Sequence, residues 1–285
     1  RLFLVSSKPI IMGGICSLIL PIQKVYFNIS GLGYLFISLK LKARLLKKLV
    51  LVIYKIIFLN KRSTVIFQNN DDLDYFINKG VVSNLRVELL RGNGVDTKLF
   101  NRKKRPESIT FLFASRLLID KGIKEYLRAA RSIHDLDVKF KVAGKYDKDN
   151  PNCLSSEELD KLRDDSSVEY LEEIEYEQMP ELFNSSDVFV LPSYREGLPK
   201  VALEAACSEM PLILSNVSGC RDCLIEGQTG FLVGHNSWTD IRDKMLYFIQ
   251  NKDQIILMGK KSRQFVESNF SEKILFEQYD LLFKK

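Results

Sequence analysis

The chain of 285 residues is long enough for two domains of ordinary size, and its 46% hydrophobic and 27% charged residues exclude a disordered or collagen-like polypeptide. Its net charge of +6 conceals an asymmetry, because residues 1–105 carry a balance of +14 and residues 106–285 a balance of −8. A basic first part joined to an acidic second part predicts two domains with different partners.

The first hundred residues are predicted to be α/β, with strands near 1–6, 24–29, 64–68 and 86–90. The chain has no initiator methionine and opens in what resembles a strand already under way, so we expect an incomplete N-terminal domain. The apolar segment 10–22 could be the core of a signal peptide, but no small-residue cleavage site follows it. No apolar run of about 18–20 residues occurs, so no transmembrane helix is predicted. The turn-rich and then basic segment 91–108 is the natural linker.

One segment of the N-terminal half, 39–62, is basic and amphipathic, and not one acidic residue occurs before Asp71. Its cations are interleaved with apolar residues at roughly helical spacing: Lys40, Lys42, Arg44, Lys47, Lys48, Lys55, Lys61 and Arg62. Such a helix can lie on an anionic membrane surface, and this is the preferred interpretation. The alternative is an ordinary surface helix with a solvated charged face. Nucleic acid is not predicted as a partner, because no nucleic-acid-binding motif accompanies the cations.

From residue 107 onward, short apolar runs alternate with helical segments. Strands are predicted at 108–115, 137–144, 168–173, 187–193, 211–216 and 230–233, and helices at 121–134, 155–165, 177–185, 199–208, 237–250 and 253–268. This alternation predicts a doubly wound α/β domain, in which ligands bind at the carboxyl ends of the strands. We therefore predict domains at 1–104 and 105–268, and a C-terminal helix at 269–285 that packs back toward the N-terminal domain.

The five cysteines are odd in number and scattered, which argues against a disulfide framework and favours a reducing compartment. Cys220 and Cys223 form a C-x-x-C without a second pair, and His134 and His235 are the only histidines. Neither a zinc site nor a redox role is therefore predicted. Small buried residues on a short helix are the preferred interpretation.

Two cations follow the strand at 108–115. Ser115 ends the strand, Arg116 comes next, and Lys121 lies where a helix is predicted to start. Side-chain charge close to a helix N-terminus suits a diphosphate, although two cations at such positions could also be ordinary surface charges. After the next strand, Gly144 and Lys145 open a polar loop that contains the D-x-D pair Asp147 and Asp149. A loop beside a nucleotide is favoured there over a metal site.

Two glutamates flank a Gly-Leu-Pro turn after the strand at 187–193. Glu196 lies in the loop, Glu204 lies on the helix, and Pro199 is expected in the first helical turn. Carboxylates accept hydrogen bonds from sugar hydroxyls, while the amides from Gly197 through Leu198 to Lys200 suit phosphate. The loop is predicted to clamp a ligand that is both hydroxylated and phosphorylated.

Four segments together resemble family-4 retaining glycosyltransferases of the GT-B fold: "SRLLIDKG", "AGKYDKDNP", "VLPSYREGLPKVALEAACSEMP" and "VSGCRDCLIEGQTGFLV". The likeness is strong over 107–270 and weaker in 25–36, 64–76 and 91–96. It implies two Rossmann-like domains facing a cleft, the N-terminal one incomplete. It also implies that Arg116 and Lys121 hold the donor diphosphate, that Glu196 lies near the donor sugar with the backbone of Gly197 and Leu198, and that Glu204 binds the ribose. No metal or other cofactor is implied, and configuration is retained.

The resemblance departs at the acceptor side. Many members have a His-Gly after the corresponding N-terminal strand, whereas this chain has Ser30 and Gly31, so no catalytic histidine is assigned and Ser30 is a weak substitute. The resemblance implies transfer of a hexose or N-acetylhexosamine from a nucleotide sugar, expected to be UDP-linked, to a lipid-linked saccharide. Surface polysaccharide assembly, of O-antigen or capsule, at the inner face of the cytoplasmic membrane is the expected setting. The alternatives are a remnant that binds nucleotide sugar without transfer, and a sugar-phosphate synthase with a soluble acceptor.

Overall fold

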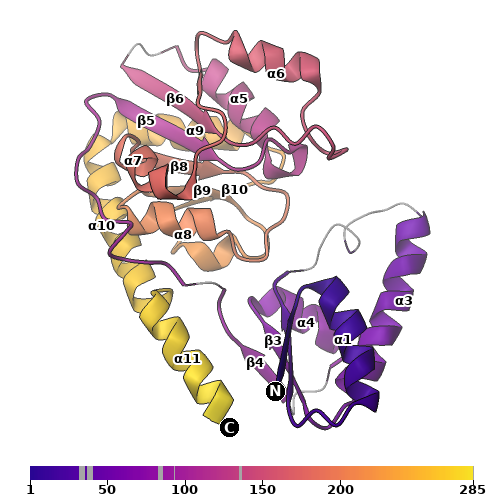
Figure 1. Cartoon of the computed structure of the whole chain (residues 1–285). Coiled ribbons are helices and arrows are strands. Elements are labelled where there is room, and N and C mark those ends of the chain that lie inside the picture. Colours follow the sequence, from indigo (N-terminus) through magenta and orange to yellow (C-terminus); the bar gives the residue numbers. More distant parts are fainter. Residues whose placement is uncertain (32–35, 37–40, 83–85, 93, 135–136, 285) are drawn as a thin grey trace. The chain divides into compact units, whose positions relative to one another are not determined.

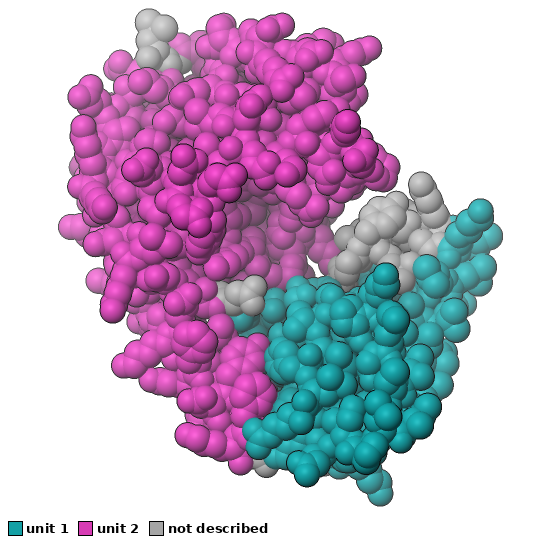
Figure 2. All heavy atoms as spheres, in the orientation of Figure 1, with its two compact units in different colours: residues 1–92 teal, residues 93–285 magenta. Residues whose placement is uncertain are grey.

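A computed structural model describes residues 1–31, 36, 41–82, 86–92, 94–134 and 137–284. The chain divides into two compact units, Arg1–Gly92 and Asn93–Lys285, which Figure 2 colours teal and magenta. Each unit contains a parallel sheet covered by helices (Figure 1). The predicted boundary at 104/105 lies inside the second unit. Residues before it pack there, because Phe100 is fully buried in that unit's core and Arg102 donates hydrogen bonds to the carbonyls of Phe183 and Ser186.

Unit 1 contains a four-stranded sheet whose described strands follow one another in chain order. The strands are β1 (Leu2–Val5), β2 (Val25–Ile29), β3 (Ser63–Phe67) and β4 (Val87–Leu89), and every neighbouring pair is parallel. The helices are α1 (Ser7–Ile19), α3 (Leu41–Phe58) and α4 (Asn70–Asn78). All five residues of β2 are buried, which explains why its sequence is a continuous apolar run apart from one asparagine. The four predicted strands of this half are confirmed.

Unit 2 contains a six-stranded parallel sheet in the order β10-β9-β8-β5-β6-β7. Its strands are β5 (Ile109–Ala114), β6 (Val138–Ala143), β7 (Glu169–Tyr170), β8 (Val188–Leu191), β9 (Leu212–Ser215) and β10 (Gly230–Val233). Its α-helices are α5 (Ile123–Arg131), α6 (Ser156–Arg163), α7 (Met179–Asn184), α8 (Lys200–Cys207), α9 (Trp238–Gln250), α10 (Lys252–Asn269) and α11 (Glu272–Lys284). Helix α5 packs against α9, and α8 packs against α10. The predicted alternation of strands and helices is confirmed.

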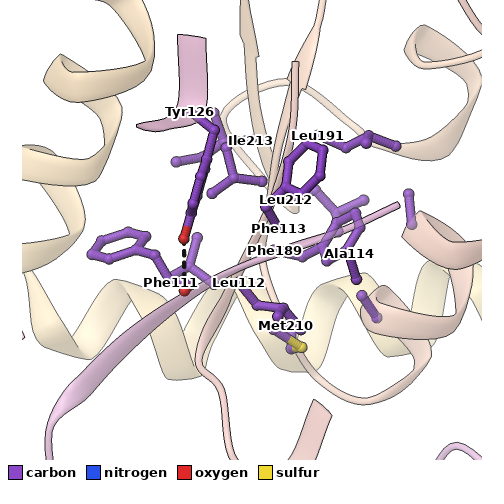
Figure 3. Packing of buried hydrophobic residues seen from close by; sticks show 14 of the residues in the cluster. Phe111, Leu112, Phe113, Ala114, Tyr126, Phe189, Leu191, Met210, Leu212 and Ile213 are labelled. Carbon is purple, nitrogen blue, oxygen red and sulfur yellow. Dashed lines mark hydrogen bonds between the residues drawn. The ribbon is translucent and has the colours of Figure 1, made fainter. Parts of the chain in front are cut away.

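The core of unit 2 lies on the central strands β5 and β8, whose residues are all buried. Figure 3 shows Phe111, Phe113, Phe189 and Leu191 of these strands packed among neighbouring apolar side chains. Tyr126 of α5 is fully buried and donates a hydrogen bond of 2.9 Å to the Phe111 carbonyl. Burial raises the pKa of its hydroxyl, so that this hydroxyl is a donor throughout the physiological range. The core therefore fixes the carboxyl ends of β5 and β8 with respect to each other.

The helix predicted from residue 121 begins differently in the structure. Ile119–Lys121 forms a short 3₁₀ helix, and α5 starts at Ile123. Gly122 separates the two with a φ of +77°, and a Cβ there would lie 2.3 Å from the Pro192 carbonyl oxygen. Lys121 therefore ends a 3₁₀ turn rather than opening an α-helix. The break lets the backbone after β5 touch the backbone after β8.

Candidate functional site

The strand order of unit 2 reverses between β5 and β8, which lie side by side at the centre of the sheet (Figure 1). From β5 the chain builds outward through β6 and β7, and from β8 it builds outward in the other direction through β9 and β10. In open α/β sheets, ligands bind at the carboxyl ends of the strands where the strand order reverses. Lys121 follows β5 and Glu196 follows β8, so both lie on loops at this position.

An ion pair joins the two loops. Lys121 Nζ lies 2.6 Å from Glu196 Oε1, and the two side chains are only 19% and 11% exposed. Ser193 Oγ donates a further hydrogen bond of 2.7 Å to the same carboxylate oxygen. The structure thus brings together two residues that are 75 positions apart in the chain and that the sequence had placed at a common site.

A third segment supports the Glu196 loop from the strand β9 side. Gly219 has a φ of +77°, and a Cβ at this position would lie 2.2 Å from the Gly197 carbonyl oxygen and 2.7 Å from that of Glu196. Only glycine allows this approach without displacing the loop. Cys220, which precedes the following 3₁₀ turn, and Cys223, which ends it, are buried as the sequence predicted. Gly219 was missed by the sequence reasoning, although it lies in the "VSGCRDC" segment that carried part of the resemblance.

Four other predicted residues line a cavity of about 230 Å³ at the carboxyl ends of β5 and β6: Ser115, Arg116, Gly144 and Lys145. Its wall also includes Glu173, Ile174, Met179 and Val201. Lys145 Nζ lies 3.0 Å from Glu173 Oε2, and the hydrogen bond to this carboxylate raises the pKa of Lys145. Lys121 and Glu196 are not among the lining residues, so Arg116 and Lys121 serve different parts of the carboxyl edge. Its lining combines apolar side chains with a few polar and charged ones, as ligand pockets in proteins commonly do.

Glu204 lies in a separate cluster on α8, where its side chain is 5% exposed. It accepts a hydrogen bond of 3.2 Å from the Tyr176 hydroxyl, and Lys200 Nζ lies 3.5 Å from the same oxygen. Burial raises the pKa of Glu204, and its two partners only partly offset this effect. No pattern in the sequence had indicated Tyr176, which stands 28 positions before Glu204 in a three-residue gap between predicted elements. The two glutamates of the E-x7-E pair thus have different partners, Lys121 for one and Lys200 with Tyr176 for the other.

Helix α8 begins at Lys200, with Pro199 as its N-cap residue rather than in the first helical turn. No acidic side chain lies in that first turn, so the positive end of the helix dipole is not neutralised from within. Gly197 and Leu198 form the approach to this helix end and are half-buried. The arrangement is compatible with an anion at the start of α8.

The predicted acceptor-side residues lie in unit 1. Ser30 is exposed directly after β2, and Gly31 has a φ of +125°. Leu32 and Gly33 of the same motif lie outside the described residues, as does Lys40 of the basic segment. Within the described ranges, no group of three or more His, Cys, Asp or Glu side chains could hold a metal ion. None of the described helices is long and apolar enough to cross a membrane.

Comparison with known proteins identifies the family. The family described as glycosyl transferases group 1 matches residues 95–269. A relative from Campylobacter jejuni, named N,N'-diacetylbacillosaminyl-diphospho-undecaprenol alpha-1,3-N-acetylgalactosaminyltransferase, is 26% identical over 90% of this chain and 69% of its own length. The capsular polysaccharide biosynthesis glycosyltransferase CapM of Staphylococcus aureus is 29% identical over 60% of this chain, but the match spans only 44% of CapM.

Solved structures share the fold. Sucrose-phosphate synthase from Thermosynechococcus elongatus superposes with a TM-score of 0.85 at 20% identity, covering 99% of this chain and 73% of its own. Anabaena HepE, solved in complex with UDP and glucose, gives a TM-score of 0.80 at 16% identity, covering 99% of this chain and 77% of its own. The predicted α/β fold of the GT-B class, with parallel sheets, is confirmed.

Proposed function

Because the chain belongs to the glycosyl transferases group 1 family, we propose that it transfers a hexose or N-acetylhexosamine from a UDP-linked sugar to a lipid-linked saccharide with retention of configuration. The names of two relatives support the acceptor class, since one acts on a diphospho-undecaprenol substrate and the other serves capsular polysaccharide biosynthesis. The UDP found with HepE supports the nucleotide. Surface polysaccharide assembly at the inner face of the cytoplasmic membrane is the setting we propose.

The observation that carries the proposal is the ion pair between Lys121 and Glu196 at the strand-order reversal. When the bond between the anomeric carbon and the diphosphate oxygen breaks, its electron pair goes to the diphosphate and negative charge builds up there. Lys121 can stabilise that charge, with Arg116 at the carboxyl end of β5 and the start of α8 as further positive groups. Glu196 would then face the donor sugar, and the acceptor hydroxyl supplies the oxygen that forms the new glycosidic bond while its proton passes to the departing diphosphate. We propose that these groups suffice without a metal ion.

The rest of the donor fits the remaining predicted residues. The cavity beside Gly144 and Lys145 has the size and the apolar side chains that a pyrimidine base needs. Glu204 is held by Lys200 and Tyr176, and its second carboxylate oxygen can accept a hydrogen bond from a ribose hydroxyl. We therefore assign the base to the cavity and the ribose to Glu204.

The basic helix α3 supports a membrane-bound acceptor. Its inner face is buried through Val50, Tyr54 and Ile57. An apolar stripe that recurs every three or four residues runs along a different face, and each member is more than half exposed: Leu45, Leu49, Val52, Ile56 and, just past the helix, Leu59. A helix with a solvated charged face would not expose such a stripe. We propose that this stripe contacts the bilayer.

The cations of α3 complement that stripe. Lys42, Arg44, Lys48 and Lys55 are exposed, whereas Lys47 is half-buried and donates a hydrogen bond of 3.0 Å to the Phe36 carbonyl. The four exposed cations would each contribute about 1 kcal/mol of attraction to an anionic bilayer. The first part of the chain contains no acidic residue before Asp71 that could offset this attraction.

Calorimetry with UDP tests the donor site. Lys121→Ala should weaken UDP binding by at least about tenfold, because a charged hydrogen bond in a partly buried site contributes about 1.5–3 kcal/mol. Lys124→Ala is the matched control, since Lys124 lies three residues further on and forms an ion pair of the same length, 2.6 Å, with Glu158. Equal affinities of the wild type and Lys121→Ala would refute the assignment of the diphosphate. UDP binding without sugar transfer or hydrolysis would favour the alternative of a binding protein that lacks turnover.

Vesicle sedimentation tests the membrane surface. Changing Lys42, Arg44, Lys48 and Lys55 to Gln should release the protein from vesicles rich in phosphatidylglycerol. The control changes four cations of unit 2, Lys252, Lys260, Lys261 and Lys273, and should leave binding intact. Loss of binding in both variants would mean that net charge alone is responsible. Unchanged binding of the α3 variant would exclude the proposed surface.

A further inference from the structure

Tyr194 connects three loops at the carboxyl edge of unit 2. It lies two residues before Glu196, and its backbone N–H donates a hydrogen bond of 2.8 Å to the Asp120 carbonyl, next to Lys121. Its hydroxyl donates a hydrogen bond of 2.9 Å to Glu125 Oε1 on α5 and lies 3.3 Å from Asn236 Oδ1. The loops after β5, β8 and β10 therefore meet at one residue, through its backbone and its side chain together.

The Glu125 carboxylate on α5 depends on the Tyr194 hydroxyl for its hydrogen bond. Within the described part of the chain, the other oxygen of the Glu125 carboxylate is buried and has no hydrogen-bond partner, and the same is true of Asp120 Oδ1. Removing the Tyr194 hydroxyl would leave a largely buried carboxylate without a donor, which is costly. Burial, the hydrogen bond to Glu125 and the charges of Glu125 and Asp120 raise the pKa of Tyr194 to about 12. The hydroxyl is therefore protonated and able to donate at any physiological pH.

This connection differs from the ion pair in how a donor substrate would affect it. A diphosphate that binds Lys121 competes with Glu196 for the ammonium group, so the ion pair holds the β5 and β8 loops together less strongly while the donor is bound. The hydrogen bonds of Tyr194 go to Asp120, Glu125 and Asn236, which are not groups assigned to the donor. They can therefore persist in both states.

We infer that Tyr194 is a positioning residue, which keeps Lys121 and Glu196 in register when a diphosphate weakens the ion pair between them. The inference rests on the proposed donor site for its functional consequence, but the coupling between the loops does not. The hydroxyl need not touch the substrate, because it holds Glu125 of α5, the helix that follows Lys121, on one side and its own loop, which carries Glu196, on the other.

The coupling is measured in the ligand-free protein by amide hydrogen exchange. Tyr194→Phe should accelerate exchange in two peptides at once, one covering 118–124 and the other 192–198. Glu125→Ala should reproduce this effect, whereas Glu125→Gln, which keeps an acceptor oxygen, should restore slow exchange. Tyr247→Phe removes a hydroxyl from a half-buried tyrosine on α9 and serves as the control. Acceleration confined to 192–198, or absent from both peptides, would overturn the inference whether or not the protein binds nucleotide.

The functional consequence is measured by comparing UDP with uridine in calorimetry. In Tyr194→Phe, UDP binding should weaken about fivefold while uridine binding stays unchanged, because only the diphosphate uses Lys121. A general loss of structure would weaken both ligands equally, and that result would also overturn the inference. A wild-type protein that binds no UDP would instead refute the proposed function, and the exchange experiment would still decide the role of Tyr194.

Discussion

The ion pair between Lys121 and Glu196 leads to a prediction that runs against the usual effect of mutating a site residue. Replacing Glu196 by Gln removes the negative charge that pairs with Lys121, yet keeps an oxygen that can accept the hydrogen bond from Ser193. If the diphosphate binds Lys121, this variant should bind UDP more tightly than the wild type. The same change should abolish or strongly reduce sugar transfer, because the carboxylate beside the donor sugar is lost.

The magnitude follows from the distances. Lys121 Nζ lies 2.6 Å from the Glu196 carboxylate, so a phosphate oxygen at an ordinary contact of about 2.8 Å on its other side would lie roughly 5 Å from that carboxylate. Two unit charges at roughly 5 Å repel by about 3 kcal/mol at an effective dielectric constant of about 20. Solvent at the mouth of the site reduces this repulsion, so we expect a gain of about 1–2 kcal/mol, which is a five- to thirtyfold increase in affinity.

The assay is isothermal titration of UDP into the wild type and Glu196→Gln at equal ionic strength. Glu158→Gln is the matched control, because it removes one negative charge from unit 2 and breaks an ion pair of the same length, that between Lys124 and Glu158. The control should leave UDP affinity unchanged. If Glu196→Gln bound UDP as weakly as the wild type, or more weakly, Glu196 and the diphosphate would not be competing for Lys121.

Three further results are expected. Burial raises the pKa of Glu204, so at pH values just above 4.5 the folded protein keeps a proton that the unfolded chain releases. The free energy of unfolding should therefore fall as the pH rises through that window. Glu204→Gln should remove this slope in urea titrations and should also weaken UDP binding. Arg263→Ala should lower the free energy of unfolding by about 3 kcal/mol in urea, because the guanidinium donates hydrogen bonds to three backbone carbonyls at 2.7–3.0 Å. Gly219→Ala should destabilise the protein by about 2 kcal/mol in the same assay and weaken UDP binding, since its Cβ would collide with the Gly197 carbonyl.

The sheet of unit 2 could be predicted because its strands are buried on both faces. Strands such as β5 and β8 are then nearly continuous apolar runs, which a reader of the sequence can separate from the amphipathic helices between them. The positions of Lys121 and Glu196 after strand ends followed from the same pattern. Their pairing did not, because it depends on β5 lying next to β8, and strand order is a property of the whole sheet.

Other features depend on contacts that leave no periodic signal. The partner of Glu204 is Tyr176, which lies outside the predicted strands and was not distinguished from any other aromatic residue. The segment before residue 105 looked like a linker from its composition, whereas Arg102 attaches it to the carbonyls at the end of α7. The basic segment 39–62 predicted a helix with charged and apolar residues, but only the structure separates its buried apolar face from its exposed one.

The ion pair shows why the loop after β8 can carry a glutamate at all. A carboxylate that is 11% exposed is costly unless a cation compensates for it, and Lys121 does so. A bound diphosphate would take over Lys121, and the sugar hydroxyls of the same donor would then provide Glu196 with new hydrogen-bond donors. A nucleoside diphosphate without its sugar also binds Lys121, but it has no sugar hydroxyls that could donate hydrogen bonds to Glu196. The intact nucleotide sugar should therefore gain more affinity from Glu196 than UDP does, so that Glu196 discriminates between substrate and product as well as facing the reacting centre.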